Sequence, residues 1–205
     1  MKLTQYDAVI FDLGGVIINL NYDLTIQAFE ELGMRDFSEV YTQLAQSTLF
    51  DDYETGRISS QHFINKLLDH VPSGTSPNRI VAAWNAMILD VPVEKPQLLK
   101  SLNAEMPIFL LSNTNEIHMQ KVNREWGISS NEVLENHFSK VYLSYELGMR
   151  KPDLEIFQKV CAEQILIPKN TLFNDDSPQH TEGAQLAGLQ TLHLKHPQEF
   201  YDLFS

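Results

Sequence analysis

Cysteine is nearly absent from this sequence, with Cys161 the single example among 205 residues. One thiol cannot form a disulfide within the chain, and there is no second cysteine to build a Cys-x-x-Cys zinc motif. This usage excludes a disulfide-stabilised scaffold and is typical of a reducing compartment. We therefore expect a cytoplasmic protein.

Basic residues are also few. The chain has 15 lysines and arginines against 27 aspartates and glutamates, which gives a formal net charge of −12 with histidine neutral. Because this sign repels phosphate backbones and anionic lipid headgroups, we expect neither nucleic-acid nor membrane partners. Any anionic ligand must then be captured by a local cationic site.

Long apolar runs are missing as well. None approaches the roughly 18 residues that a membrane-spanning helix needs, and residues 1–11 lack the pattern of a signal peptide. The hydrophobic share of 43% nevertheless lies in the globular range. We expect one domain with an insert, present as a monomer or a weak homo-oligomer.

What the sequence does contain is a series of short apolar runs, each of the first four without polar alternation. They span residues 8–11, 108–111, 141–143 and 171–173, with a weaker fifth at 190–194. Such runs suit parallel strands that are buried on both faces, and residues at helical spacing follow most of them. Asn174 is interpreted as an early end of the fourth strand. The pattern predicts an α/β fold, a doubly wound parallel sheet of the Rossmann-like kind.

A long segment with helical periodicity separates the first run from the second. Its apolar spacing and start signals predict four helices, over residues 24–32, 37–49, 60–71 and 77–87. Asparagine and proline mark its two connections to the rest of the chain, at residues 19–23 and 89–96. We expect a core of residues 1–18 and 93–205 and an inserted, all-helical subdomain of residues 19–92.

Polar and charged side chains follow four of the runs, close to where each expected strand ends. Singly, each has an ordinary explanation as a turn residue, a helix cap or a solvated loop. Because parallel strands bring their carboxyl ends to one edge of the sheet, we expect all of these residues to meet there. They are Asp12 and Gly14 after the first run, Ser112 and Asn113 after the second, Lys151 after the third, and Asp175 and Asp176 after the fourth.

This set of side chains matches the needs of phosphoryl transfer. Carboxylates from two strands supply the hard oxygen ligands that Mg²⁺ prefers, and Lys151 and Ser112 supply donors for a phosphate beside it. Asp12 can then attack phosphorus and form an aspartyl-phosphate that water hydrolyses. The sequence therefore predicts a Mg²⁺-dependent phosphatase that acts on a small phosphorylated metabolite.

At these residues the chain resembles the haloacid dehalogenase-like superfamily, whose motifs are a strand-end Asp, a Ser or Thr, a Lys and an acidic pair. All four are present in order, and the helical insert resembles the family's cap. Residues 110–115 and 142–152 are similar to the branch that contains bacterial α-glucose-1-phosphate phosphatase. The resemblance implies that Asp12 is the nucleophile and that Mg²⁺ binds to Asp12, the Gly14 carbonyl, Asp175 and Asp176. It also implies that the phosphoryl group is held by Ser112, Asn113 and the catalytic Lys151.

Gly14 departs from the family pattern, because most phosphatases of the superfamily carry a second Asp there as general acid and base. Losing such a group typically costs roughly 10²–10⁴ in rate. A sugar 1-phosphate has a better leaving group than an ordinary alkoxide, so we hypothesise a substrate of that kind. The alternative is a non-catalytic descendant that binds or regulates. Phosphonate or acyl-phosphate hydrolysis also tolerates Gly14, but related phosphonate enzymes use a cap lysine, and Lys66 is the only lysine between residues 22 and 90.

Two further candidates lie outside the four motifs. His118 follows Ser112 by six residues and is the one histidine near the expected edge, although a structural role is its ordinary interpretation. The acidic segment 51–57 is either an exposed loop or a segment that faces the carboxyl edge. In the second case, Tyr53 or Arg57 would help to select the leaving group.

Overall fold

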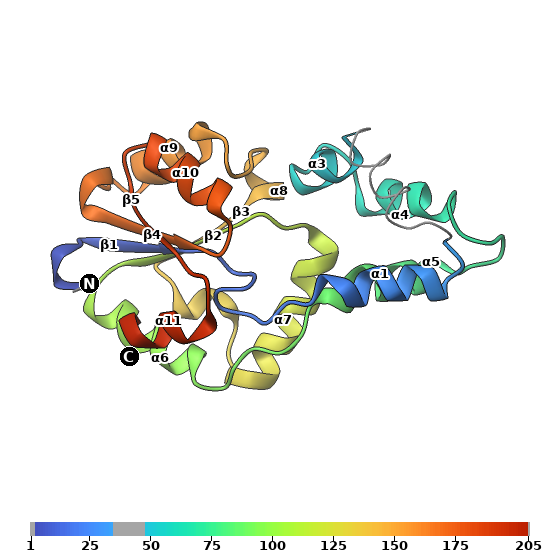
Figure 1. Ribbon diagram of the computed structural model, residues 1–205, viewed down its shortest axis with the longest axis horizontal. Helices are drawn as coiled ribbons and strands as arrows, with labels where there is room; N and C mark the ends of the chain where they lie inside the picture. The colour runs from blue at the N-terminus through green and yellow to red at the C-terminus, as the bar shows by residue number, and fades with distance from the viewer. Residues whose placement is uncertain (1–2, 35–47, 205) are drawn as a thin grey trace.

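The computed structural model describes residues 3–34 and 48–204. In this part of the chain the strands form one parallel sheet in the order β3-β2-β1-β4-β5 (Figure 1). They are β1 (Ala8–Phe11), β2 (Ile108–Ser112), β3 (Lys140–Leu143), β4 (Thr171–Asp175) and β5 (Gln190–His193). The chain fills one side of β1 first and then returns to β4 on the other side, so the strand order reverses between β1 and β4. The prediction of a doubly wound parallel sheet is confirmed.

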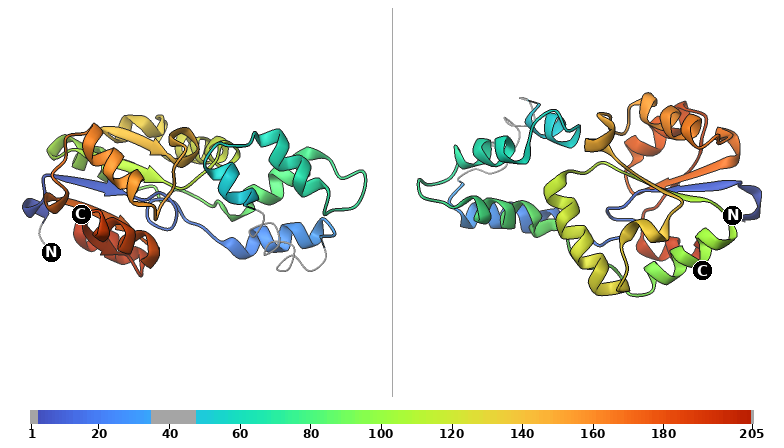
Figure 2. Two further views of the ribbon diagram at one scale, coloured as in Figure 1. Left: turned by 90° about the horizontal axis from the view of Figure 1, so that it is seen from above. Right: turned by 180° about the vertical axis from the view of Figure 1, so that it is seen from behind.

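Helices cover both faces of this sheet (Figure 2). One face carries α6 (Lys95–Glu105), α7 (Glu116–Ser130) and α11 (Pro197–Phe204), and the other carries α9 (Leu154–Glu163) and α10 (Pro178–Leu186). Side chains alternate along β1, so Val9 and Phe11 pack with the first group and Ala8 and Ile10 with the second. Burial on both faces explains why the run is apolar without alternation.

Shorter elements complete the core. The helix α8 (Ser144–Leu147) follows β3 directly and ends at Gly148, before the loop that carries Lys151. Short 3-10 helices are η1 (Leu3–Gln5), η3 (Leu134–His137) and η4 (Pro168–Asn170). Across residues 3–34 and 48–204, no helix has the length and apolar character that crossing a membrane requires.

The fourth strand runs further than the sequence indicated. Asn174, interpreted as an early strand end, lies inside β4, which continues to Asp175. The Asn174 amide donates a 3.1 Å hydrogen bond from Nδ2 to the carbonyl of Ile10 on the neighbouring strand. A polar residue is tolerated there because a partner on β1 satisfies its donor. The extension makes Asp175 the last residue of a buried strand.

Between β1 and α6, the residues that the structure describes fold mainly into helices. They are α1 (Tyr22–Glu31), α3 (Leu49–Glu54), α4 (Ser60–Leu68) and α5 (Pro77–Trp84), followed by η2 (Asn85–Met87). Ser59 caps α4, because its side chain accepts a 3.2 Å hydrogen bond from the backbone N–H of His62. Pro77 opens α5, where a missing N–H has no cost. Most of the helix predicted over residues 37–49 lies outside the described residues, and Leu49, its last residue, is the first residue of α3.

This helical insert has an aromatic cluster of its own. Phe50 stacks on Trp84 with ring centroids 5.6 Å apart, and Ile117 of α7 packs into the same cluster. The two segments that connect the insert to the sheet pair through an antiparallel bridge between Leu20 and Ile88. These contacts hold the insert beside the carboxyl edge of the sheet (Figure 1).

Candidate active site

Asp12 is the first residue after β1, at the carboxyl edge of the sheet. Its backbone N–H donates a 3.0 Å hydrogen bond to the carbonyl of Asn174, so the pairing of β1 with β4 sets its position. Its side chain is buried except for a tenth of its surface. Open α/β sheets bind ligands at this point, where the strand order reverses.

Lys151 joins the ends of β1 and β4. Its Nζ lies 2.5 Å from Asp12 Oδ1 and 2.6 Å from Asp175 Oδ2, and its side chain is wholly buried. Burial favours the neutral amine, but the two carboxylates outweigh it and raise the pKa of Lys151 above its ordinary value. The lysine is therefore a fixed positive charge between two strand ends.

The two carboxylates that share Lys151 differ in pKa. Burial raises the pKa of Asp12 to about 7 against the opposing charge of Lys151, and the charge of Asp175 adds to the increase. Burial would also raise the pKa of Asp175, but Lys151 and the nearby His180 together lower it to about 2. A divalent cation bound beside these carboxylates would favour the ionised form of each.

Asp12, Asp175 and Asp176 form a carboxylate cluster in which one oxygen of each residue lies within 4.8 Å of the other two. Lys151 pairs with two of these carboxylates, and the remaining negative charge of the cluster is one that a divalent ion would balance. Hard oxygen donors of this kind are the ligands that Mg²⁺ prefers, so the residues present fit this ion. Gly15 makes the arrangement possible, because its φ is +70° and a β carbon there would overlap Asp176 Oδ2.

A small recess of about 100 Å³ opens at this edge. Gly14 and Ser112 line it from the core, and Tyr22 and Glu54 line it from the insert. The hydroxyl of Ser112 makes a long contact of 3.5 Å to the carbonyl of Asn113, which leaves it able to donate to a ligand. The recess thus connects the strand ends with the helical insert.

Asn113 lies at the same edge, but its side chain contacts the backbone of Lys151. Its Nδ2 donates to the Lys151 carbonyl at 2.9 Å, and its Oδ1 accepts from the Lys151 N–H at 2.8 Å. These two hydrogen bonds position the loop that carries the lysine. Contact between the Asn113 side chain and a phosphoryl group stays a prediction, and the positioning role is one that the sequence did not reveal.

His180 is a residue of this site that the sequence analysis missed. Its Nδ1 lies 3.0 Å from both carboxylate oxygens of Asp175, and the backbone N–H of Ser177 donates to the same carboxylate at 2.8 Å. These contacts hold Asp175 in place opposite Lys151. The sequence feature that could have identified His180 is its position about one helical turn after the acidic pair, which is a weak pattern by itself.

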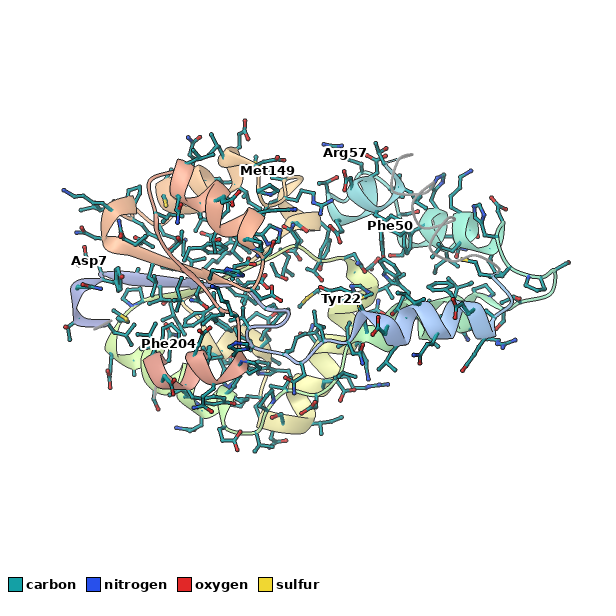
Figure 3. The ribbon with its side chains drawn as sticks, viewed as in Figure 1. Asp7, Tyr22, Phe50, Arg57, Met149 and Phe204 are labelled. Carbon is teal, nitrogen blue, oxygen red and sulfur yellow. The ribbon has the colours of Figure 1, made fainter. Side chains whose placement is uncertain are left out.

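The other sequence candidates have mainly structural contacts. His118 lines the recess, but its Nε2 donates to the Trp84 carbonyl at 3.2 Å and burial lowers its pKa to about 4. Tyr53 lies in the aromatic cluster of the insert, and Arg57 is 64% exposed at its outer surface (Figure 3). Neither of these two lines the recess, so their part in selecting a leaving group stays a prediction. The segment 51–57 does reach the recess, through Glu54.

Comparison with known proteins agrees with this geometry. The model of the haloacid dehalogenase-like (HAD) hydrolases matches residues 6–188. A D-ribitol-5-phosphate phosphatase from Bacteroides thetaiotaomicron is 31% identical over 183 residues, which cover 89% of each chain.

Solved structures show the same fold. A HAD family enzyme from Bacteroides thetaiotaomicron, in complex with magnesium and inorganic phosphate, has a TM-score of 0.84 at 35% identity, and the match covers 91% of this chain and 93% of the other. A HAD-like family hydrolase from Porphyromonas gingivalis has a TM-score of 0.82 at 31% identity and covers 92% and 90%. The extent of the family match and the four motifs at one sheet edge show that this chain belongs to the haloacid dehalogenase-like hydrolases.

Proposed function

We propose that this hydrolase is a Mg²⁺-dependent phosphatase that acts on a small phosphorylated metabolite. The main support is the shared contact of Lys151 Nζ with Asp12 Oδ1 and Asp175 Oδ2, at 2.5 and 2.6 Å. A carboxylate, a fixed cation and further carboxylates therefore surround one point. Phosphoryl transfer needs this combination, because the charge of the transferred group must be balanced while an oxygen attacks it.

In this proposal Asp12 is the nucleophile. One of its carboxylate oxygens bonds to phosphorus, the ester oxygen leaves, and an aspartyl-phosphate forms. Lys151, Ser112 and Asn113 hold the phosphoryl group, with Asn113 also positioning Lys151 through its backbone. Water then attacks phosphorus, which releases inorganic phosphate and restores the Asp12 carboxylate.

Mg²⁺ is the cofactor of the proposed reaction, and it would be held by Asp12, the Gly14 carbonyl, Asp175 and Asp176. When bound, it supplies positive charge that offsets the charge of the phosphoryl oxygens. The carboxylate cluster supports this assignment, as does the magnesium and phosphate complex of the similar enzyme from Bacteroides thetaiotaomicron. The role of each ligand is part of the proposal.

The helical insert, residues 19–92, is assigned to a cap domain over a core of residues 1–18 and 93–205. Its separate aromatic cluster and the bridge between Leu20 and Ile88 support this division. Glu54 and Tyr22 bring the insert to the recess at the strand ends. A cap in this position excludes bulk water while the phosphoryl group is transferred.

The substrate class is a phosphorylated sugar or polyol. The relative named D-ribitol-5-phosphate phosphatase supports a polyol phosphate. Gly14 supports the narrower hypothesis of a sugar 1-phosphate, since a hemiacetal leaving group depends less on protonation. Turnover of a sugar 1-phosphate, its 6-phosphate isomer and ribitol 5-phosphate separates these possibilities. A clear preference for the 6-phosphate would contradict the narrower hypothesis.

Hydrolysis of p-nitrophenyl phosphate tests the proposed function. We expect turnover by the wild type with Mg²⁺, its loss after chelation, and its loss in Asp12→Asn, which keeps the shape of the side chain but removes the nucleophile. No metal-dependent turnover would favour a non-catalytic binding protein instead. The cytoplasmic location and the monomeric or weakly oligomeric state stay predictions, and size-exclusion chromatography checks the second.

A further inference from the structure

The leaving oxygen of a phosphate ester needs a proton unless it leaves easily, and Gly14 has no side chain to supply one. In the described parts of the chain, the titratable side chains that line the recess are Tyr22, Glu54 and His118. Tyr22 stands at the start of α1, and 61% of its surface is exposed (Figure 3). It is therefore a poor candidate for proton transfer in a site that excludes water.

His118 has both ring nitrogens engaged away from the recess. Its Nε2–H donates to the carbonyl of Trp84 at 3.2 Å, and its Nδ1 accepts from Asn115 Nδ2 at 3.1 Å. The ring also stacks on Trp84 with centroids 4.9 Å apart. These partners assign a neutral imidazole whose one proton is already donated, so His118 positions α7 against the insert.

Glu54 is different, because one of its carboxyl oxygens lacks a hydrogen bond. It is the last residue of α3, which lies beside α8 near the strand ends (Figure 1). Its Oε2 is covered from solvent without a hydrogen bond, although the side chain as a whole is 22% exposed. A nitrogen of Arg150 lies 3.1 Å from this oxygen, so the two groups interact by charge alone. Arg150 therefore offsets part of the cost of covering this oxygen but does not use its capacity to form a hydrogen bond.

The surroundings of Glu54 also suit proton transfer. Burial raises the pKa of this carboxyl to about 7, against the opposing charge of Lys151. A group that donates a proton in one step and accepts one in the next works best when its pKa lies near the working pH. The carboxyl thus has both the position and the acidity that Gly14 cannot provide.

We propose that the carboxyl of Glu54 is the general acid and base of this enzyme, and that it reaches the leaving oxygen from the insert across the recess beside Gly14. The inference rests on the proposed phosphatase function and names the residue that handles the proton. A general acid at this position widens the range of substrates from esters with good leaving groups to ordinary alkyl phosphates, which include phosphorylated polyols.

Both half-reactions conserve the proton and the electron pairs. An Asp12 carboxylate oxygen bonds to phosphorus while the bond from phosphorus to the ester oxygen breaks, and that oxygen keeps the electron pair and takes the proton of Glu54. The products are the alcohol, the aspartyl-phosphate and the Glu54 carboxylate. A water oxygen then bonds to phosphorus while its proton moves to Glu54. The bond from phosphorus to Asp12 breaks, its electron pair returns to the Asp12 carboxylate, and inorganic phosphate leaves.

A purely structural role for Glu54 is the competing explanation. Arg150 precedes Lys151 and contacts both Asp51 and Glu54 of α3, so these pairs connect the insert to the core. Asp51 makes the same kind of contact, but its side chain is 55% exposed and it does not line the recess. Asp51→Asn is therefore a matched control for Glu54→Gln, which keeps the shape of the side chain and removes its acid.

The test compares two substrates at saturating Mg²⁺. The nitrophenolate of p-nitrophenyl phosphate leaves without a proton, whereas the alkoxide of ribitol 5-phosphate needs one. We expect Glu54→Gln to lower kcat on the alkyl phosphate by about 10²-fold or more and to change kcat on the aryl phosphate by a few-fold at most. Asp51→Asn is expected to keep the wild-type ratio between the two substrates. Retained aryl turnover also shows that each variant is folded.

Three results would overturn the inference and leave the proposed function intact. One is an equal loss on both substrates in Glu54→Gln, and another is an equally selective loss in Asp51→Asn. The third is a wild type that hydrolyses the aryl phosphate but no alkyl phosphate. A wild type that hydrolyses neither substrate would overturn the phosphatase function itself, so the two failures are distinguishable.

Discussion

Replacing Gly15 with alanine tests the acidic cluster from a backbone position beside Asp176. Gly15 has a φ of +70°, and a β carbon there would overlap Asp176 Oδ2. The substitution therefore has two effects, a strained backbone and a displaced carboxylate. Only the second effect concerns Mg²⁺.

Gly148 is a control that separates the two effects. Its φ is +69°, and a β carbon there would have no atom within 4 Å. The left-handed conformation costs an alanine roughly 1–2 kcal/mol, and the lower entropy of the unfolded chain offsets about 0.4–1 kcal/mol of this. We expect Gly148→Ala to lose about 1 kcal/mol of unfolding free energy, and Gly15→Ala to lose at least as much.

Urea denaturation measures the loss of unfolding free energy that backbone strain causes. The dependence of Tm on Mg²⁺ concentration measures how tightly the protein binds Mg²⁺. A ligand at 100 times its Kd stabilises a protein by about 2.7 kcal/mol. A variant that binds Mg²⁺ more weakly therefore needs a higher Mg²⁺ concentration to reach the same stabilisation. Gly15→Ala is expected to need more Mg²⁺ for both stabilisation and turnover, whereas Gly148→Ala keeps the wild-type dependence. Gly74→Ala is a second control, because Gly74 has a φ of +90° in the insert and a β carbon there would have no atom within 4 Å. An identical Mg²⁺ dependence in all three variants would show that Asp176 is not a ligand of the metal.

Two further predictions concern stability. Ile165 has a φ of +55° and is 90% exposed, so Ile165→Asn is expected to raise the unfolding free energy by about 1 kcal/mol in urea, and an unchanged midpoint would contradict this. Burial lowers the pKa of His118 from its ordinary value of 6.5 to about 4, so the unfolded state binds more protons than the folded state between these pH values. The unfolding free energy is expected to fall as the pH drops from about 6.5 to about 4, and the variant His118→Gln is expected to lose part of this pH dependence. Urea titrations that give parallel pH profiles for the wild type and the variant would contradict the prediction.

The sheet and its carboxyl edge could be predicted because burial on both faces leaves a strong local pattern. The run at 8–11 is apolar throughout, and Asp12 directly after it marks the end of the buried strand. The same reasoning brought Ser112 and Asp175 to one edge. It ended the fourth strand too early, because the hydrogen bond between Asn174 and Ile10 has no signature in the sequence.

Contacts between distant loops could not be predicted. Asn113 bonds to the backbone of Lys151, 38 residues further along the chain, and Gly15 packs against Asp176. Each of these contacts depends on how loops from different strands meet. A side chain at a sheet edge can face the ligand or a neighbouring loop, and residue type alone does not distinguish the two.

The order of apolar and polar residues acts locally, and it is enough to specify which strands form, which edge they share, and which acids and cations gather there. Which part of the insert meets that edge depends on how the insert packs against the core. Glu54 lines the recess and Asp51, three residues earlier on the same short helix, does not. That helix is held by contacts between segments far apart in the sequence, among them the packing of Phe50 on Trp84 and the ion pair of Glu54 with Arg150.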